Sequence, residues 1–216
     1  MSAEFEYAKP TPLMIQTSGE GVIQAEAHVP EGATAVVVLS HPHPMFGGDM
    51  YNPLIDHLFA TLPTSGPGPA IGVVRYNFRG VGRSTGEFAD GIGEREDTEA
   101  VFEFAAGLGT GPVVSAGWSF GADVSLSANH EALAGWLAIA APLAIVQPSD
   151  MIAAADARPK LLLVPEFDQY RKPQPAAEII VDWPNTEMIT IEGADHFLGT
   201  QAPIVAEAAA QFVASL

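Results

Sequence analysis

The chain has 216 residues, 48% of them hydrophobic, which is enough for one domain over residues 1–216 with a sizeable core. Its formal net charge is −17, from 26 acidic and 9 basic residues, and this acidity argues against nucleic acids and anionic membrane surfaces as partners. The absence of cysteine excludes disulfides, a thiolate nucleophile and thiolate-bound metals.

The first residues, Met1 to Glu6, lack the basic start and apolar run of a secretory signal peptide. The longest apolar stretches, such as 35–39, are far too short to cross a bilayer. We therefore expect a cytoplasmic protein that does not bind membranes.

Strand-like and helix-like segments alternate along the chain. Short apolar runs predict strands at 21–29, 35–39, 71–76, 113–116, 135–140, 160–164 and 188–191, and the run at 35–39 is β-branched, as suits a strand buried on both faces. Helical spacing of apolar residues predicts helices at 51–62, 94–108, 119–129, 176–181 and 202–216, with a short helix at 151–155 and a loop at 64–69. This alternation predicts an α/β fold with a mostly parallel sheet covered by helices on both faces, and ligands bind such sheets beyond the carboxyl ends of the strands.

A serine follows one of these strands in a pattern typical of a nucleophile. The segment matches G-x-S-x-G, as Gly117-Trp118-Ser119-Phe120-Gly121, between a predicted strand and a predicted helix. Such a sharp turn holds the serine in strained dihedrals and presents its hydroxyl above the sheet, while the N–H of Phe120 points at a developing oxyanion. A chance match in a glycine-rich chain is the alternative, and the flanking segments argue against it.

The general base of such a serine is expected late in the chain, between the last strand and the last helix. His196 stands there, while His28, His57 and His130 fall where solvation alone accounts for a histidine. The acid is expected after the strand at 160–164, where both Glu166 and Asp168 occur.

The loop after the strand at 35–39 carries two histidines and two prolines, as Ser40-His41-Pro42-His43-Pro44. This is where the second oxyanion donor is expected; because Pro44 has no N–H, Met45 or Phe46 must donate, and we assign the role to the backbone of Met45. A metal site at His41 and His43 with Asp49 is the alternative, but no clear further ligand stands nearby, so we expect no metal and interpret both histidines as hydrogen-bonded to their own loop.

A second glycine-rich segment, residues 77–86, follows the strand at 71–76. Its glycines do not have the G-x-G-x-x-G spacing of a dinucleotide loop, so we expect no nucleotide cofactor. We predict instead that Arg79 pairs with Glu94 or Asp97 and holds this loop in place.

Taken together, these motifs resemble the small, lidless α/β hydrolases related to dienelactone hydrolase. The matching segments are His41-Pro42-His43-Pro44 with Gly47-Gly48 and Asn52, Asn77 to Gly82 with Ser84 and Gly86, Gly91 to Glu94 with Asp97, Gly117 to Gly121, Asp168 with Pro173, and Gly193 to Phe197. The resemblance implies an α/β-hydrolase fold without a large lid and a triad of Ser119, Asp168 and His196. Pro165 stands where the resemblance leads us to expect a glycine.

Dienelactone hydrolase itself has a cysteine nucleophile, so its substrate does not carry over to a chain with Ser119. We expect a serine hydrolase, a carboxylesterase acting on small-molecule esters with short acyl groups through an acyl-enzyme, with no cofactor. Phe46 and Trp118 are the expected substrate-binding residues, although core packing also accounts for aromatic residues there. A thioesterase or peptidase with the same triad, or a binding protein of the same fold, are the alternatives. The sequence gives no oligomeric state.

Overall fold

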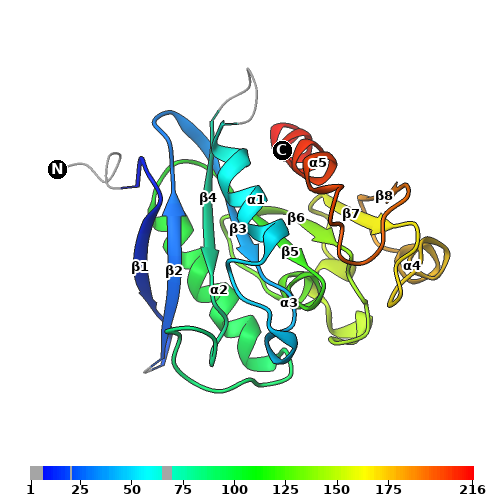
Figure 1. Ribbon diagram of the computed structural model, residues 1–216, viewed down its shortest axis with the longest axis horizontal. Helices are drawn as coiled ribbons and strands as arrows, with labels where there is room; N and C mark the ends of the chain where they lie inside the picture. Colours follow the sequence, from blue (N-terminus) through cyan, green and yellow to red (C-terminus); the bar gives the residue numbers. More distant parts are fainter. Residues whose placement is uncertain (1–6, 20, 65–69) are drawn as a thin grey trace.

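The computed structural model describes residues 7–19, 21–64 and 70–216, which are arranged around one open sheet (Figure 1). Its eight strands are β1 (Thr11–Gln16), β2 (Val22–His28), β3 (Ala33–Ser40), β4 (Ala70–Tyr76), β5 (Val113–Trp118), β6 (Leu133–Ile139), β7 (Lys160–Pro165) and β8 (Thr186–Ile191). The α-helices are α1 (Pro53–Thr61), α2 (Ile92–Gly107), α3 (Phe120–Ser127), α4 (Pro173–Ile180) and α5 (Ala202–Ala214).

The strand order is β1-β2-β4-β3-β5-β6-β7-β8. Strand β2 is antiparallel to both β1 and β4, whereas all pairs from β4 to β8 are parallel. The carboxyl ends of β3, β5, β7 and β8 therefore lie at one edge of the sheet, and the loops that follow them can meet there.

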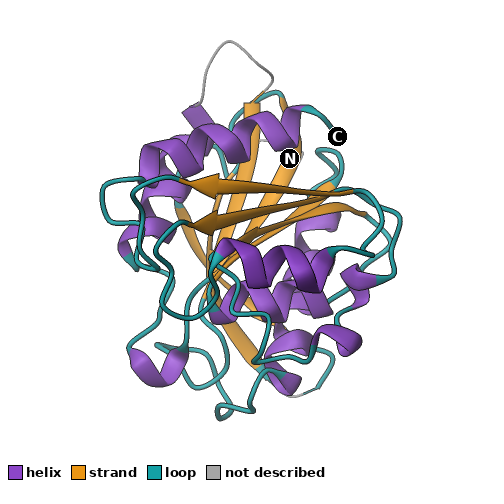
Figure 2. Cartoon of the chain, turned by 90° about the vertical axis from the view of Figure 1, so that its right-hand side faces the viewer, coloured by secondary structure: helices purple, strands orange, loops and turns teal. Residues whose placement is uncertain are grey.

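The sheet is covered on both faces, as a buried parallel sheet requires (Figure 2). In β3, Val36 and Val38 face the core under α2 and α3, while Val37 and Leu39 face the core under α1 and α5. This alternation accounts for the nearly continuous run of apolar residues in β3, because both faces of the strand are buried.

The predicted strands and helices are confirmed with boundaries shifted by a few residues. The short helix predicted at 151–155 is a 3₁₀ turn, η5 (Ile152–Ala154). The predicted loop at 64–69 is described only at Thr64, where the 3₁₀ turn η3 (Leu62–Thr64) ends, and its remaining residues lie outside the described part of the chain.

Strand β1 was not predicted from the sequence. It contains Pro12, which lacks a backbone N–H, and its residues are mostly exposed or half-buried. Both features suit the edge of a sheet, where one row of backbone groups faces away from any partner strand, and both weaken the apolar pattern of a strand. Among residues 7–19, 21–64 and 70–216, no helix has the length and apolar character needed to span a membrane.

Candidate active site

Ser119 lies at the sharp turn between β5 and α3. Its backbone has φ 58° and ψ −120°, a strained region for a residue with a side chain. The flanking glycines permit this turn: a Cβ on Gly117 would overlap the carbonyl of Gly121, and a Cβ on Gly121 would overlap the carbonyls of Ser40 and His41. The G-x-S-x-G pattern therefore reflects steric limits on both sides of the serine.

Three side chains from distant parts of the chain form one hydrogen-bonded line. The Nε2 atom of His196 lies 2.8 Å from Oγ of Ser119, and Nδ1 of His196 lies 2.8 Å from Oδ2 of Asp168. The carboxylate requires a proton on Nδ1, so Nε2 is left to accept the serine hydroxyl. All three side chains are buried or nearly so.

The loop after β7 fixes the orientation of Asp168. Its second oxygen, Oδ1, accepts the backbone N–H groups of Tyr170 and Arg171 at 2.7 and 3.0 Å. The competing acid, Glu166, points elsewhere and accepts the N–H of Gly193. The arrangement thus brings Asp168, rather than Glu166, to the imidazole.

The loop that carries His196 is held by two further side chains. The indole N–H of Trp118 donates to the carbonyl oxygen of His196 at 3.2 Å, and the N–H of His196 donates to Oε1 of Gln169 at 3.3 Å. The ring centroid of Tyr170 lies 4.5 Å from that of the His196 imidazole, and the ring centroid of Phe197 lies 5.8 Å from it. The imidazole is therefore held between neighbouring loops.

The serine and the histidine open onto a cavity of about 690 Å³. Phe46 and Trp118, which the sequence predicts as substrate-binding residues, both line it. The other lining residues besides Ser119 and His196 are Pro42, His43, Gly48, Asn52, Pro142, Ala144, Ile145, Tyr170 and Phe197. Phe197 directly follows His196 and Tyr170 stands two residues after Asp168, and this nearness to triad residues is the signal that could have found them. Residues 142–145 lie in a loop with no motif, so no sequence pattern marks them.

The two predicted oxyanion donors differ in their surroundings. Phe120 is the first residue of α3, and its N–H has no acceptor in the described part of the chain, as expected at a helix start. The N–H of Met45 instead donates to Nδ1 of His43 at 3.2 Å, and the Met45 side chain is exposed and does not line the cavity. Met45 could act as a donor only if this bond to His43 opened.

Both histidines of the proline-rich loop are bonded to the loop region, as the sequence predicts. Nδ1 of His41 lies 2.6 Å from the carbonyl oxygen of Pro42, and Nε2 accepts the N–H of Phe78 at 3.1 Å. His43 accepts the N–H of Met45. Within the described residues, no three His, Asp or Glu side chains come together in a way that could hold a metal ion.

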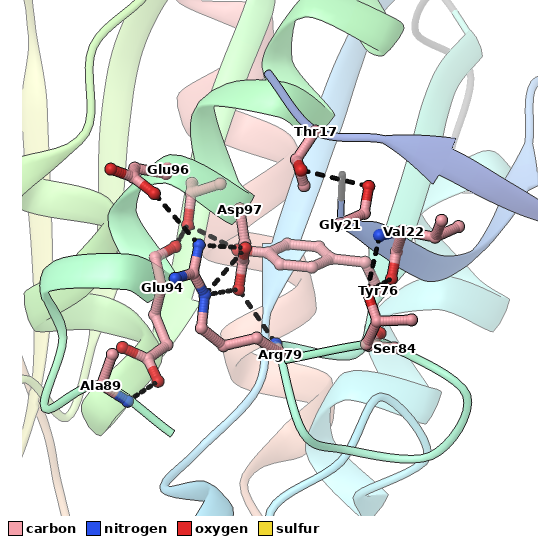
Figure 3. A network of polar contacts seen from close by, with 12 residues as sticks. Thr17, Gly21, Val22, Tyr76, Arg79, Ser84, Ala89, Glu94, Glu96 and Asp97 are labelled. Atoms are coloured by element: carbon pink, nitrogen blue, oxygen red, sulfur yellow. Dashed lines mark hydrogen bonds and ion pairs between the residues drawn. The ribbon is translucent and has the colours of Figure 1, made fainter. Parts of the chain in front are cut away.

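The second glycine-rich segment is pinned by Arg79 (Figure 3). The guanidinium donates to the buried carboxylate of Asp97 and to Glu96, and the backbone N–H of Arg79 also donates to Asp97. The prediction that Arg79 pairs with Glu94 or Asp97 is therefore confirmed, and Asp97 is the partner. The carboxylate of Glu94 accepts instead the N–H groups of Ala89 and Gly91, just before α2. Glu94 is the third residue of α2, and its bond to the N–H of Gly91, the residue before the helix, is the glutamate half of a capping box that fixes the helix start.

Comparison with known sequences gives a match over a short part of the chain. No family model matches the chain. A segment of 80 residues is 38% identical to an uncharacterized protein of Rickettsia prowazekii (strain Madrid E), covering 37% of this chain and 31% of that protein.

Solved structures match over nearly the whole length. An α/β serine hydrolase homologue from Coxiella burnetii has a TM-score of 0.81 at 26% identity, over 94% of this chain and 97% of that one. A serine hydrolase without a lid from Xanthomonas campestris has a TM-score of 0.77 at 27% identity, over 93% and 91%. An esterase from Pyrococcus furiosus shares the fold, with a TM-score of 0.77 at 14% identity, over 95% and 92%.

The chain therefore has the α/β-hydrolase fold, and its structural neighbours are α/β hydrolases and esterases. These similarities support hydrolase activity. They give neither the bond that is cleaved nor the substrate, because one fold supports many chemistries.

Proposed function

We propose that this protein is a serine hydrolase that cleaves carboxylic esters with small or short acyl groups through an acyl-enzyme, in the manner of the lidless hydrolases related to dienelactone hydrolase. The observation that carries the proposal is the continuous line from Asp168 through His196 to Ser119, which ends in an open cavity. A serine hydroxyl needs an adjacent base to become a good nucleophile, and the imidazole is within hydrogen-bond reach of it.

In this mechanism, Oγ of Ser119 attacks the ester carbonyl while Nε2 of His196 takes the hydroxyl proton. Asp168 holds the imidazole in the correct tautomer and stabilises the imidazolium. The imidazolium then gives its proton to the leaving alkoxide as the bond between carbonyl carbon and alcohol oxygen breaks. A water molecule, deprotonated by His196, hydrolyses the acyl-enzyme and restores Ser119.

The tetrahedral intermediate needs donors for its oxyanion. The free N–H of Phe120 at the start of α3 supports a role as one donor. The second donor comes from the loop after β3, and Met45 can supply it once its N–H leaves His43. The N–H of His43 itself is the alternative, since it has no acceptor among the described residues and His43 lines the cavity.

The surroundings of the cavity favour substrates with small acyl groups. Between β6 and β7 the described chain holds only two 3₁₀ turns, η4 (Pro148–Asp150) and η5, and no helix long enough to form a lid. The cavity is lined mainly by apolar and aromatic side chains, which suits uncharged esters of modest size.

The test compares the wild type with Ser119→Ala on 4-nitrophenyl acetate and on a fluorophosphonate probe. We expect the wild type to hydrolyse the ester and to be labelled at Ser119, and the variant to lose about a thousandfold or more of the turnover and all labelling while keeping its melting temperature. Hydrolysis that persists in Ser119→Ala would overturn the assignment.

Thioesters and peptides are the other substrates open to the same triad. A panel of acetyl ester, thioester and anilide with one leaving-group scaffold separates them, and we expect the highest kcat/KM for the ester. A protein that binds esters without cleaving them would fail the fluorophosphonate test, because a serine without an active base reacts slowly.

A further inference from the structure

Large aromatic side chains are exposed around the mouth of the cavity. Phe46, Tyr170 and Phe197 line it and are 85%, 63% and 62% exposed. They come from three separate loops, after β3, β7 and β8. Exposed apolar groups that gather at one concave site mark a binding surface, since isolated ones would be scattered over the molecule.

Two of these rings lie next to the imidazole on which the proposed reaction depends. The Tyr170 and Phe197 rings lie 4.5 and 5.8 Å from the His196 ring, at interplanar angles of 60° and 87°. His196 must pass its proton to the leaving oxygen of the ester, so that oxygen has to approach Nε2. An alcohol group attached to that oxygen would then be close to Tyr170 and Phe197, which also line the cavity.

The charge of the side chains that line the cavity further restricts the alcohol portion of the substrate. The lining side chains with polar atoms are those of His43, Asn52, Trp118, Ser119, Tyr170 and His196, with no lysine or arginine among the lining residues described. The pKa of His43 is lowered from its ordinary value, chiefly by burial, so its ring is neutral near pH 7. A carboxylate on the substrate would find no cationic partner there and would lose solvation on binding.

From these observations we propose that the alcohol portion of the substrate is an uncharged aromatic group, bound against Tyr170 and Phe197. This inference rests on the proposed ester hydrolysis and specifies its substrate class as aryl or arylalkyl esters. Aromatic rings pack edge-to-face or offset with ring centroids about 4.5–7 Å apart, which a benzyl-type group can reach beside either side chain.

The experiment measures kcat/KM for benzyl butyrate, ethyl butyrate and 4-carboxybenzyl butyrate, which share one acyl group. We expect benzyl butyrate to exceed the ethyl ester and the carboxylated ester by about tenfold or more, because burying a phenyl ring contributes roughly that factor. Equal values for benzyl and ethyl butyrate, or a preference for the carboxylated ester, would overturn the inference.

Substitutions test whether the preference for benzyl butyrate depends on the rings of Tyr170 and Phe197. Tyr170→Ala and Phe197→Ala should lower the ratio of kcat/KM for benzyl butyrate to kcat/KM for ethyl butyrate about fivefold or more, because the lost ring contacts only the benzyl group. Tyr170→Phe should keep the wild-type preference for benzyl over ethyl butyrate, because the ring and not the hydroxyl is needed. Phe167→Ala is the matched control: Phe167 is an exposed aromatic of the same loop that does not line the cavity.

Fluorophosphonate labelling of Ser119 in every variant keeps the two proposals apart. Labelling of the wild type without a benzyl preference contradicts the aromatic site and leaves the hydrolase intact. Absence of both labelling and hydrolysis in the wild type contradicts the hydrolase itself. A labelled Tyr170→Ala or Phe197→Ala protein that keeps the full benzyl preference also overturns the aromatic site.

Discussion

His41 shows how a single side chain can hold the loop beside the proposed nucleophile. Its Nδ1 donates to the carbonyl oxygen of Pro42, and its Nε2 accepts the N–H of Phe78. This pairing requires the neutral ring with its proton on Nδ1, because a second proton on Nε2 would face the N–H of Phe78. Burial lowers the pKa of His41 from 6.5 to about 4, in agreement with these contacts.

The neutral state of His41 predicts a pH dependence of stability. The unfolded chain takes up a proton near pH 6.5 and the folded chain only near pH 4, so the stabilisation from His41 is present above pH 6.5 and is lost as the pH falls toward 4. The variant His41→Gln removes this proton uptake. We expect the melting temperature of the wild type to fall more steeply than that of the variant between these pH values.

At pH 7.5 we expect His41→Gln to lower the free energy of unfolding by about 1–3 kcal/mol, because a buried backbone group loses its partner. Burial raises the pKa of Asp123 to about 6, and its titration strengthens the fold as the pH falls, but both proteins carry it, so it cancels in the comparison. His57→Gln on α1 is the control and should follow the wild type. Parallel curves for the wild type and His41→Gln would contradict the argument.

Between β6 and β7, a loop forms one wall of the cavity and is held from two sides. The buried carboxylate of Asp123, one turn after Ser119, accepts the N–H groups of Leu143, Ala144 and Ile145 at 2.9, 3.0 and 2.9 Å. From the other side, Nε of Arg171 donates to the carbonyl oxygen of Pro142 at 2.8 Å. The wall is thereby tied both to the helix that carries the nucleophile and to the loop that carries the acid.

We predict that Asp123→Asn displaces this wall. The amide has one acceptor oxygen, and its NH₂ group would face a backbone N–H, so the fold should lose about 1–3 kcal/mol and the KM for a benzyl ester should rise about tenfold. Fluorophosphonate labelling of Ser119 should change less than about twofold, because the triad does not move.

Asp156→Asn is the matched control for this variant, since Asp156 also accepts a backbone N–H, that of Arg158, but lies outside the cavity lining. Its KM should stay at the wild-type value. A wild-type KM in Asp123→Asn, with a lowered melting temperature, would assign Asp123 to stability alone.

Among the strands, helices and loops, the sequence predicted those that a repeated apolar pattern specifies and missed those that depend on tertiary contacts. The buried strands and the turn at Ser119 follow from local patterns, namely short apolar runs and the glycines on both sides of the serine. The edge strand β1 and the cavity wall at 142–145 have no such pattern. The wall depends on Asp123 accepting hydrogen bonds from residues about twenty positions away, which no local signal shows.

The predicted oxyanion donor Met45 illustrates the same limit within one loop. The lack of a backbone N–H on proline excluded Pro44 as a donor. It could not show that the N–H of Met45 donates to Nδ1 of His43. That contact depends on the ring position of His43, which packs against Phe46, Phe88 and Phe120 from different segments. Sequence spacing therefore located the loop and left its hydrogen bonds undetermined.

The whole molecule carries a net charge of −17, which acts on substrates before they reach the cavity. At an ionic strength of 0.01 M the screening length is about 30 Å, so an approaching ester experiences most of the protein's charge, whereas at 0.1 M it is about 10 Å. The field should slow the approach of anionic esters and should not affect neutral ones.

We predict that kcat/KM for 4-carboxybenzyl butyrate rises about threefold or more as salt is raised from roughly 0.01 to 0.5 M, while that for benzyl butyrate stays within about twofold. A benzyl ester with a 4-trimethylammonium group should show the opposite slope, because salt screens an attraction instead of a repulsion. The measurement is the initial rate at substrate concentrations far below KM, where association contributes most. If salt changed all three rates equally, the cause would be an effect of salt on the protein, and the net charge would have no part in substrate selection.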